Sequence, residues 1–194
     1  MTLDKYNQKR NFDSTGEPQG EVENSQNDLI FVIQKHAASH LHYDFRLELH
    51  GVLKSWAIPK GPSMNPDDKR LAIIVEDHPY AYKDFEGTIP EGNYGAGTVI
   101  VWDNGTYTIP EEQSKVATEN KLKADLENGH VSFTLNGKKL KGEFSLIKLK
   151  NKEDNSWLLI KKNDSYATDI DILKKNKSVL SNATLEDLEK KIKY

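Results

Sequence analysis

Residues 41–49 read Leu41-His42-Tyr43-Asp44-Phe45-Arg46-Leu47-Glu48-Leu49. Every odd position of this stretch is apolar or aromatic, and every even position is polar. Successive side chains of a β-strand point to opposite faces, so this alternation indicates a strand with one face in the core. Lys, Thr, Glu and Ser would be expected on a face that meets only water. The succession of His, Asp and Arg on the polar face therefore favours a functional surface.

Short segments with strand-like patterns continue along the chain and are separated by Gly, Pro and Asn residues. The candidate strands are residues 29–36, 41–49, 52–58, 71–76, 98–102, 105–109, 130–135, 142–150 and 157–161. Few helices intervene, so the pattern is typical of an antiparallel barrel or sandwich. Of these two architectures we expect the barrel. The expected fold is mainly β, a closed antiparallel barrel of about eight strands with a few peripheral helices.

Two helices are expected near the surface. Residues 111–127 form one candidate, which would end at Asn128-Gly129. Residues 185–193 form the other, where Thr184 followed by Asp187 resembles a capping box. The polar residues 1–28 contain Gly16, Pro18 and Gly20, which predict an irregular arm and not a packed element.

Composition excludes several functional classes. The 194 residues carry 27 Lys and Arg against 30 Asp and Glu, a net charge of −3, which argues against a domain held to nucleic acid by bulk positive charge. The absence of cysteine excludes disulfides, thiolate zinc sites and cysteine catalysis. No signal sequence and no membrane-spanning run is recognised, so we expect a cytoplasmic protein with no membrane partner.

Histidines cluster around the alternating strand and indicate a metal site. His42 and Asp44 lie about 7 Å apart on one face of that strand, close enough to converge on one ion. Two imidazoles and a carboxylate suit a first-row divalent cation. His36 or His40 could supply the third ligand, and their spacing does not choose between them.

Two later segments have strand-end and loop character. His78 follows an apolar strand in Glu76-Asp77-His78-Pro79, which is a frequent position for a functional polar group. Residues 86–97 hold four glycines and lack the Gly-Lys-Ser/Thr ending of a nucleotide-binding loop, so they are interpreted as a structural connection.

Several of these blocks together resemble the 3′-phosphoesterase module of the bacterial DNA ligase D family. The resemblance rests on residues 31–36, 41–48, 55–63, 69–72, 76–79, 87–103 and 157–162, and it spans roughly residues 9 to 166. Modules of this family also occur as stand-alone proteins, which is the expectation here. The division expected is a polar arm, residues 1–28, contributing to the active site, a phosphoesterase barrel, residues 29–166, and a C-terminal extension, residues 167–194, ending in a helix.

The resemblance implies a Mn²⁺-dependent DNA 3′-end-processing enzyme, with other divalent first-row metals as substitutes. It would act as a 3′-ribonucleoside phosphodiesterase and a 3′-phosphomonoesterase on DNA or DNA–RNA primer-template ends in end joining. A DNA ligase, a polymerase and a Ku-like end-binding protein are the partners implied. The metal ligands by resemblance are His36, His42 and Asp44. The other site residues are His78, Arg46, Lys60, Arg70, Tyr82, Arg10, Glu17 and Gln34.

His78 is expected to protonate the departing ribose oxygen or to contact the phosphate as an imidazolium. One departure from the family pattern lies in the arm, which reads Arg10-Asn11-Phe12 where the family commonly has Arg-Asp-Phe. The neutral amide of Asn11 in place of a carboxylate predicts that activity could be reduced. Two alternatives remain. One is an end-binding accessory module of the same fold with weakened catalysis, and the other is a cupin-type metal oxygenase.

Overall fold

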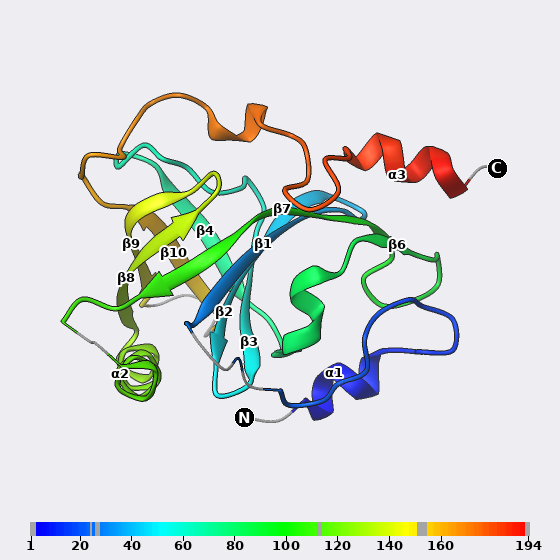
Figure 1. Ribbon diagram of the computed structural model, residues 1–194, viewed down its shortest axis with the longest axis horizontal. Helices are drawn as coiled ribbons and strands as arrows, with labels where there is room; N and C mark the ends of the chain where they lie inside the picture. Colours follow the sequence, from blue (N-terminus) through cyan, green and yellow to red (C-terminus); the bar gives the residue numbers. More distant parts are fainter. Residues whose placement is uncertain (1–2, 24, 26–27, 112–113, 151–154, 193–194) are drawn as a thin grey trace.

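A computed structural model of the chain describes residues 3–23, 25, 28–111, 114–150 and 155–192. The barrel strands are β1 (Ile30–Ala37), β2 (Leu41–Leu49), β3 (Val52–Ile58), β4 (Lys69–Ile74), β7 (Gly97–Thr108), β8 (His130–Gly137), β9 (Lys141–Lys148) and β10 (Ser156–Lys161). These eight antiparallel strands follow one another around the barrel as β1-β2-β3-β4-β10-β9-β8-β7, and β7 pairs with β1 to close it (Figure 1). The expected fold class is confirmed.

The barrel core is built from the odd-numbered residues of β2 and their counterparts on the other strands. Tyr43, Phe45, Leu47 and Leu49 are all buried in one apolar cluster with residues of the remaining strands. The Phe45 ring stacks on that of Phe133 across the barrel, with ring centroids 5.7 Å apart. The period-two pattern of residues 41–49 therefore determines which side of β2 faces the core.

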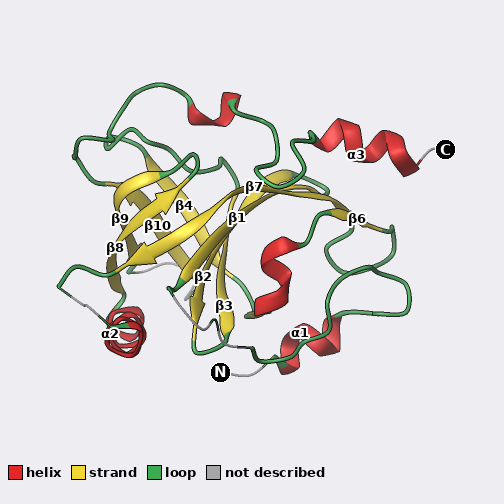
Figure 2. Ribbon diagram, viewed as in Figure 1, coloured by secondary structure: helices red, strands yellow, loops and turns green. Residues whose placement is uncertain are grey.

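The outer face of β1, β2 and β3 is covered by a second layer of protein. This layer consists of α1 (Asp4–Lys9), β5 (His78–Pro79), the 3-10 helix η1 (Tyr80–Asp84) and β6 (Gly87–Ile89) (Figure 2). Tyr6 of α1 and Tyr82 of η1 are buried there against Val32, Leu53 and Val101 of the barrel wall. The polar face of β2 is thus enclosed between barrel and cover.

The expectation of an irregular N-terminal arm is wrong for residues 4–9. They form α1, whose Tyr6 is fully buried and donates its hydroxyl hydrogen to the Pro18 carbonyl at 2.7 Å. The Tyr6 ring also packs against Phe12 and Tyr82. The segment is polar on average, and a few aromatic side chains are enough to fix it to the barrel.

Two expected strands, residues 98–102 and 105–109, are one continuous strand, β7. Gly105, the first residue of the second expected strand, pairs with Gly137 of β8. A Cβ atom at Gly105 would come within 2.1 Å of the Asn136 carbonyl oxygen. Glycine is needed there because β8 approaches closely, and the chain does not turn.

The two expected helices are present with shifted bounds. The first is α2 (Lys115–Asn128), which begins after the N-cap Ser114 and ends at Gly129 in the left-handed conformation. The second is α3 (Leu185–Ile192), where Thr184 and Asp187 exchange the two hydrogen bonds of a capping box. Residues 112–113 and 193 of the expected helices lie outside the described residues.

The C-terminal extension contains a further 3-10 helix, η2 (Ile172–Lys174). Between η2 and α3 the extension contacts β7 (Figure 1). The Trp102 indole donates to the Lys175 carbonyl at 2.6 Å, and the Val179 amide donates to the Val101 carbonyl at 2.9 Å. Across the described part of the chain, each helix is too short or too polar to cross a bilayer.

The alternation in β2 can be tested by stability. Phe45→Ala is expected to lower the free energy of unfolding by about 3–5 kcal/mol, because it leaves a cavity in a fully buried core. The matched control Leu41→Ala, at a 50% exposed position of the same strand, is expected to change it by less than about 0.5 kcal/mol. Urea denaturation followed by tryptophan fluorescence measures both. A loss for Phe45→Ala no larger than that for Leu41→Ala would show that Phe45 does not lie in the core.

Candidate active site

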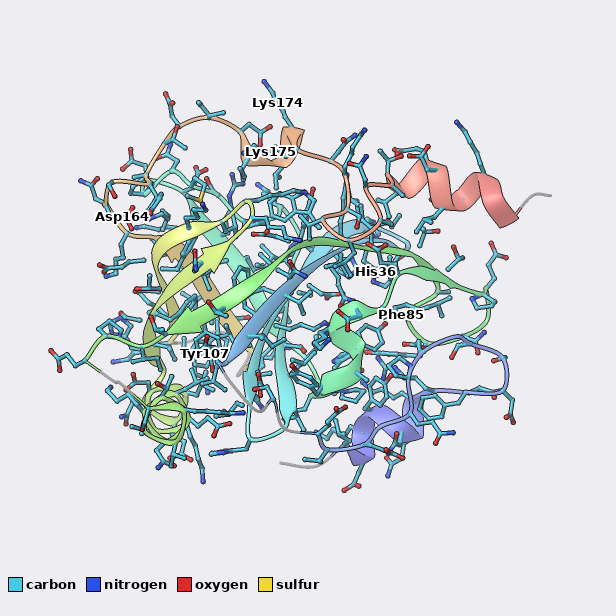
Figure 3. The ribbon with its side chains drawn as sticks, viewed as in Figure 1. His36, Phe85, Tyr107, Asp164, Lys174 and Lys175 are labelled. Carbon is cyan, nitrogen blue, oxygen red and sulfur yellow. The ribbon has the colours of Figure 1, made fainter. Side chains whose placement is uncertain are left out.

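Three potential metal ligands meet on the outer face of the barrel. Pairing of β1 with β2 places His36 directly opposite His42, and Asp44 lies two residues further on the same face of β2. One nitrogen from each imidazole and one carboxylate oxygen of Asp44 all lie within 4.8 Å of one another. Figure 3 shows His36 on the side of the barrel covered by η1 and β6. Strand register thus unites residues that the sequence separates.

Backbone carbonyls orient both imidazoles toward Asp44. The Nε2 atom of His36 lies 2.9 Å from the Gly95 carbonyl, and the Nδ1 atom of His42 lies 2.9 Å from the His40 carbonyl. A carbonyl only accepts hydrogen bonds, so these two nitrogens carry the hydrogen. In the neutral imidazoles the other nitrogen of each ring presents a lone pair, 3.6 Å from an Asp44 oxygen.

This arrangement fits a divalent cation. Two lone pairs and a carboxylate directed at one point would repel one another without a positive charge between them. Imidazole ligands of metals commonly hold their second nitrogen in a hydrogen bond that fixes the tautomer, as the two carbonyls do here. Nitrogen and carboxylate donors in this combination suit first-row divalent ions. His36, His42 and Asp44 are therefore a candidate metal centre.

Arg46 is buried directly beside this centre. Its Nε atom donates to the Gln34 side-chain oxygen at 2.8 Å, one terminal nitrogen donates to the Ser55 hydroxyl at 2.8 Å, and the other to Asp44 at 3.2 Å. Burial alone would raise the pKa of Asp44, but the Arg46 guanidinium together with His36 and His42 outweighs it and holds that pKa well below its usual range. Asp44 is therefore ionised and available as a ligand.

His78 lies in the cover and faces the same space. Its Nδ1 atom is 3.0 Å from the Glu76 carbonyl, and its Nε2 atom is 3.0 Å from a guanidinium nitrogen of Arg10. Because guanidinium only donates, Nε2 carries the lone pair. Burial, with the positive charges of Arg46 and Arg10, lowers the pKa of His78 well below the ordinary value. These contacts favour a neutral imidazole over the expected imidazolium.

Arg10 enters the site from the N-terminal arm. Besides His78, its guanidinium donates to Glu17 at 3.0 Å and to Glu76 at 3.2 Å, and it stacks 3.8 Å from the centroid of the Tyr6 ring. Glu17 also accepts the Tyr82 hydroxyl hydrogen at 3.1 Å. Burial, with the charge of Glu17 nearby, raises the pKa of Tyr82 well above 10, so the phenol stays neutral.

A cavity of about 180 Å³ opens between barrel and cover. The expected site residues that line it are His36, His42, Asp44, Arg46, His78, Tyr82, Arg10 and Glu17. Gln34 stands behind this lining, where it accepts a hydrogen bond from Arg46 and donates to the Tyr82 and Phe85 carbonyls. A small anion placed in the cavity would face two guanidinium groups and the candidate metal centre.

Besides Gln34, two expected site residues are not among the described residues that line the cavity. Lys60 is exposed in the turn after β3, close to the end of β2 that carries His42. Arg70 lies on β4, where its guanidinium donates to Asp68 at 2.8 Å. Asn11, the departure from the family pattern, accepts a hydrogen bond from the Asp13 amide in a surface turn. It also lies outside the lining of the cavity.

Sequence reasoning missed three contributors to the site. Glu76 lines the cavity and binds both Lys9 and Arg10, and Tyr94 stands at its edge. Ser55 holds Arg46 and lies 3.3 Å from His78. The position of Glu76 two residues before His78 was a usable signal. Ser55 and Tyr94 gave no such signal, because their roles depend on contacts with segments distant in sequence.

Comparison with known proteins assigns this chain to a family. The model of the DNA ligase D 3′-phosphoesterase domain family matches residues 34–148. Among curated proteins, the multifunctional non-homologous end joining protein LigD of Pseudomonas aeruginosa is 49% identical over 191 residues, which cover 94% of this chain and 22% of that protein. Its counterpart from Mycolicibacterium smegmatis is 40% identical over 157 residues, covering 80% of this chain and 20% of that protein.

The multifunctional non-homologous end joining DNA repair protein LigD of Mycobacterium tuberculosis is 43% identical over 147 residues, or 75% of this chain and 18% of that protein. This chain thus spans about a fifth of the length of the curated relatives it matches. The matched range, residues 34–148, includes the candidate ligands His36, His42 and Asp44, called the metal triad below. It also includes Arg46, His78 and Tyr82. The chain belongs to the DNA ligase D 3′-phosphoesterase domain family.

Proposed function

We propose that this chain is a Mn²⁺-dependent phosphoesterase that processes 3′ ends of DNA. The observation that carries the proposal is the convergence of His36, His42 and Asp44 beside the buried guanidinium groups of Arg46 and Arg10 in one small cavity. A cation centre next to two arginines is suited to a phosphate, whose oxygens can bind to both.

The proposed substrates are primer-template ends that terminate in a ribonucleoside or in a 3′-phosphate. The similar LigD proteins are named for non-homologous end joining, and we extend that role to this chain. A DNA ligase, a polymerase and a Ku-like end-binding protein are the proposed partners. The proposal assigns residues 1–28 to an arm that brings Arg10 and Glu17 to the barrel, residues 29–166. Residues 167–194 form the extension.

Hydrolysis requires stabilisation of negative charge on the transferred phosphoryl group. A bound Mn²⁺ would polarise a phosphoryl oxygen and lower the pKa of a coordinated water. Arg46, held by Gln34 and Ser55, would donate to a remaining oxygen without reorganising. Arg10, held by Glu17, would transfer its hydrogen bond from the His78 Nε2 atom to another oxygen, which frees that lone pair. Lys60 and Arg70, outside the cavity lining, would bind phosphates of the flanking strand.

The proposed role of His78 is that of a base. Its Nε2 lone pair faces the cavity side occupied by Arg10, and its Nδ1 hydrogen is held by the Glu76 carbonyl. Water adds its oxygen to phosphorus and passes a proton to Nε2, the P–O5′ bond breaks, and the released 5′-oxygen takes a proton from solvent. Tyr82, a neutral phenol hydrogen-bonded to Glu17, would orient the arm beside His78.

Loss of any of the three ligands is expected to abolish both metal binding and turnover. His42→Ala and Asp44→Ala should give no Mn²⁺ binding in calorimetric titration and at least about a 100-fold loss of phosphate release from a 3′-phosphorylated primer. His40→Ala, in which the carbonyl that orients His42 is kept, is the matched control and should retain both properties. Normal Mn²⁺ affinity in Asp44→Ala would refute the metal assignment. Tight end binding by wild-type protein without turnover would indicate an accessory module.

The protonation state of His78 is expected to differ from that of an ordinary histidine, which titrates near pH 6.5. Since burial and the two arginines depress its pKa, the His78 ring should remain neutral from pH 8 to pH 6 in NMR titration of the metal-free protein. Arg10→Met removes one of these positive charges and should raise the His78 pKa. Lys9→Met removes a more exposed cation that binds the Glu76 carboxylate and not the His78 ring, so it should have the smaller effect. A midpoint near 6.5 in wild-type protein would contradict the lowered pKa of His78.

A further inference from the structure

Tyr94 is a large aromatic residue that stays exposed at the edge of the site. Its side chain is 47% exposed, although it lines the same cavity as His78 and the metal triad. It belongs to the glycine-rich loop between β6 and β7, which the sequence indicated as purely structural. An aromatic ring held open to solvent beside a phosphate site is suited to contact with a ligand.

The position of Tyr94 is fixed by contacts on both sides. The next residue, Gly95, accepts the His36 hydrogen bond at 2.9 Å through its carbonyl, and this ties the loop to the metal triad. The Tyr94 hydroxyl accepts a hydrogen bond from Lys9 of α1 at 3.2 Å. The ring is therefore held at a constant place relative to the candidate metal centre.

Tyr94 also borders a second hollow next to the catalytic cavity. This hollow of about 380 Å³ is lined by Lys5, Lys9, Ile74, Val75, Glu76 and Tyr94. Tyr94, Val75 and Glu76 line both spaces. A phosphodiester bound at the metal centre has one substituent on each side of phosphorus, so one of them can extend past Tyr94 into the second hollow.

The chemistry of the second hollow suits a nucleoside. Aromatic faces stack on nucleobases of any sequence, and such contacts contribute about 1–3 kcal/mol per base. The Lys9 ammonium lies 4.4 Å from the centroid of the Tyr94 ring, and Lys5 stands one helical turn before Lys9. The two lysines supply positive charge near the phosphate. Ile74 and Val75 form the apolar wall of the second hollow, which is suited to the apolar face of a base or sugar.

We propose that Tyr94 stacks on the nucleobase of the 3′-terminal nucleoside that the enzyme releases, so that the second hollow is the leaving-nucleoside subsite. This inference rests on the proposed phosphodiesterase function and names where its leaving group is bound. It implies that Tyr94 contributes to the diester reaction and not to hydrolysis of a 3′-phosphate, which has no terminal nucleoside.

The test compares wild type, Tyr94→Ala and Tyr94→Phe on three primers in Mn²⁺. One primer ends in a ribonucleoside, one in an abasic ribose and one in a 3′-phosphate. Tyr94→Ala is expected to raise KM about ten-fold on the ribonucleoside primer and to leave the 3′-phosphate reaction unchanged. Tyr94→Phe keeps the ring and should remain within about two-fold of wild type. On the abasic primer, the KM of wild type should be about ten-fold higher than on the ribonucleoside primer. Tyr94→Ala should raise the KM on the abasic primer no further.

The controls separate this inference from the function it rests on. Tyr166→Ala changes an equally exposed tyrosine that lines neither hollow, and it should leave all three reactions unchanged. Equal losses of Tyr94→Ala on the ribonucleoside and 3′-phosphate primers, or unchanged KM on the ribonucleoside primer, would overturn the subsite. If wild type hydrolyses neither of those two primers, the proposed function itself fails.

Discussion

The buried guanidinium of Arg46 is the constraint around which the site is organised. A charge removed from water is tolerated only when its hydrogen-bonding groups are paired. Arg46 meets this requirement with one partner on each of three adjacent strands, namely Gln34 on β1, Asp44 on β2 and Ser55 on β3. Its three donors therefore fix the orientation of the ligand carboxylate and link the three strands that form the floor of the cavity.

The same hydrogen-bond network extends from the floor to the cover. Gln34 accepts from Arg46 with its oxygen, so its amide group points outward and donates to the carbonyls of Tyr82 and Phe85 around η1. From the arm, Arg10 joins Glu17, Glu76 and His78. The site lies between the barrel wall and this cover, outside the core cluster that fills the barrel.

The local charge of the site differs from the average charge of the chain. A net charge of −3 argues against broad electrostatic attachment to nucleic acid, yet it places no limit on one phosphate-sized cavity. Two buried arginines face three carboxylates in the cavity lining, so a divalent cation held by His36, His42 and Asp44 would make the cavity positive where a single phosphate would bind. Lys5 and Lys9 of α1 add positive charge beside Tyr94. The proposed action on strand ends is consistent with this local distribution.

The sequence by itself determined the barrel class, the strand that decides it and the shared face of His42 and Asp44, because a period of two assigns faces without knowledge of the partners. The choice of His36 over His40 as third candidate ligand came from the family resemblance, and strand pairing places His36 opposite His42. The bounds of β2 and β3 and the capping box at Thr184 follow from equally local rules. Tertiary structure alone decided that the polar face is covered, that α1 is packed and that His78 is neutral. It also placed Lys60 and Arg70 outside the cavity lining and Tyr94 at its edge. These features arise from contacts between segments far apart in sequence, such as Arg10 with His78, and no local pattern encodes them.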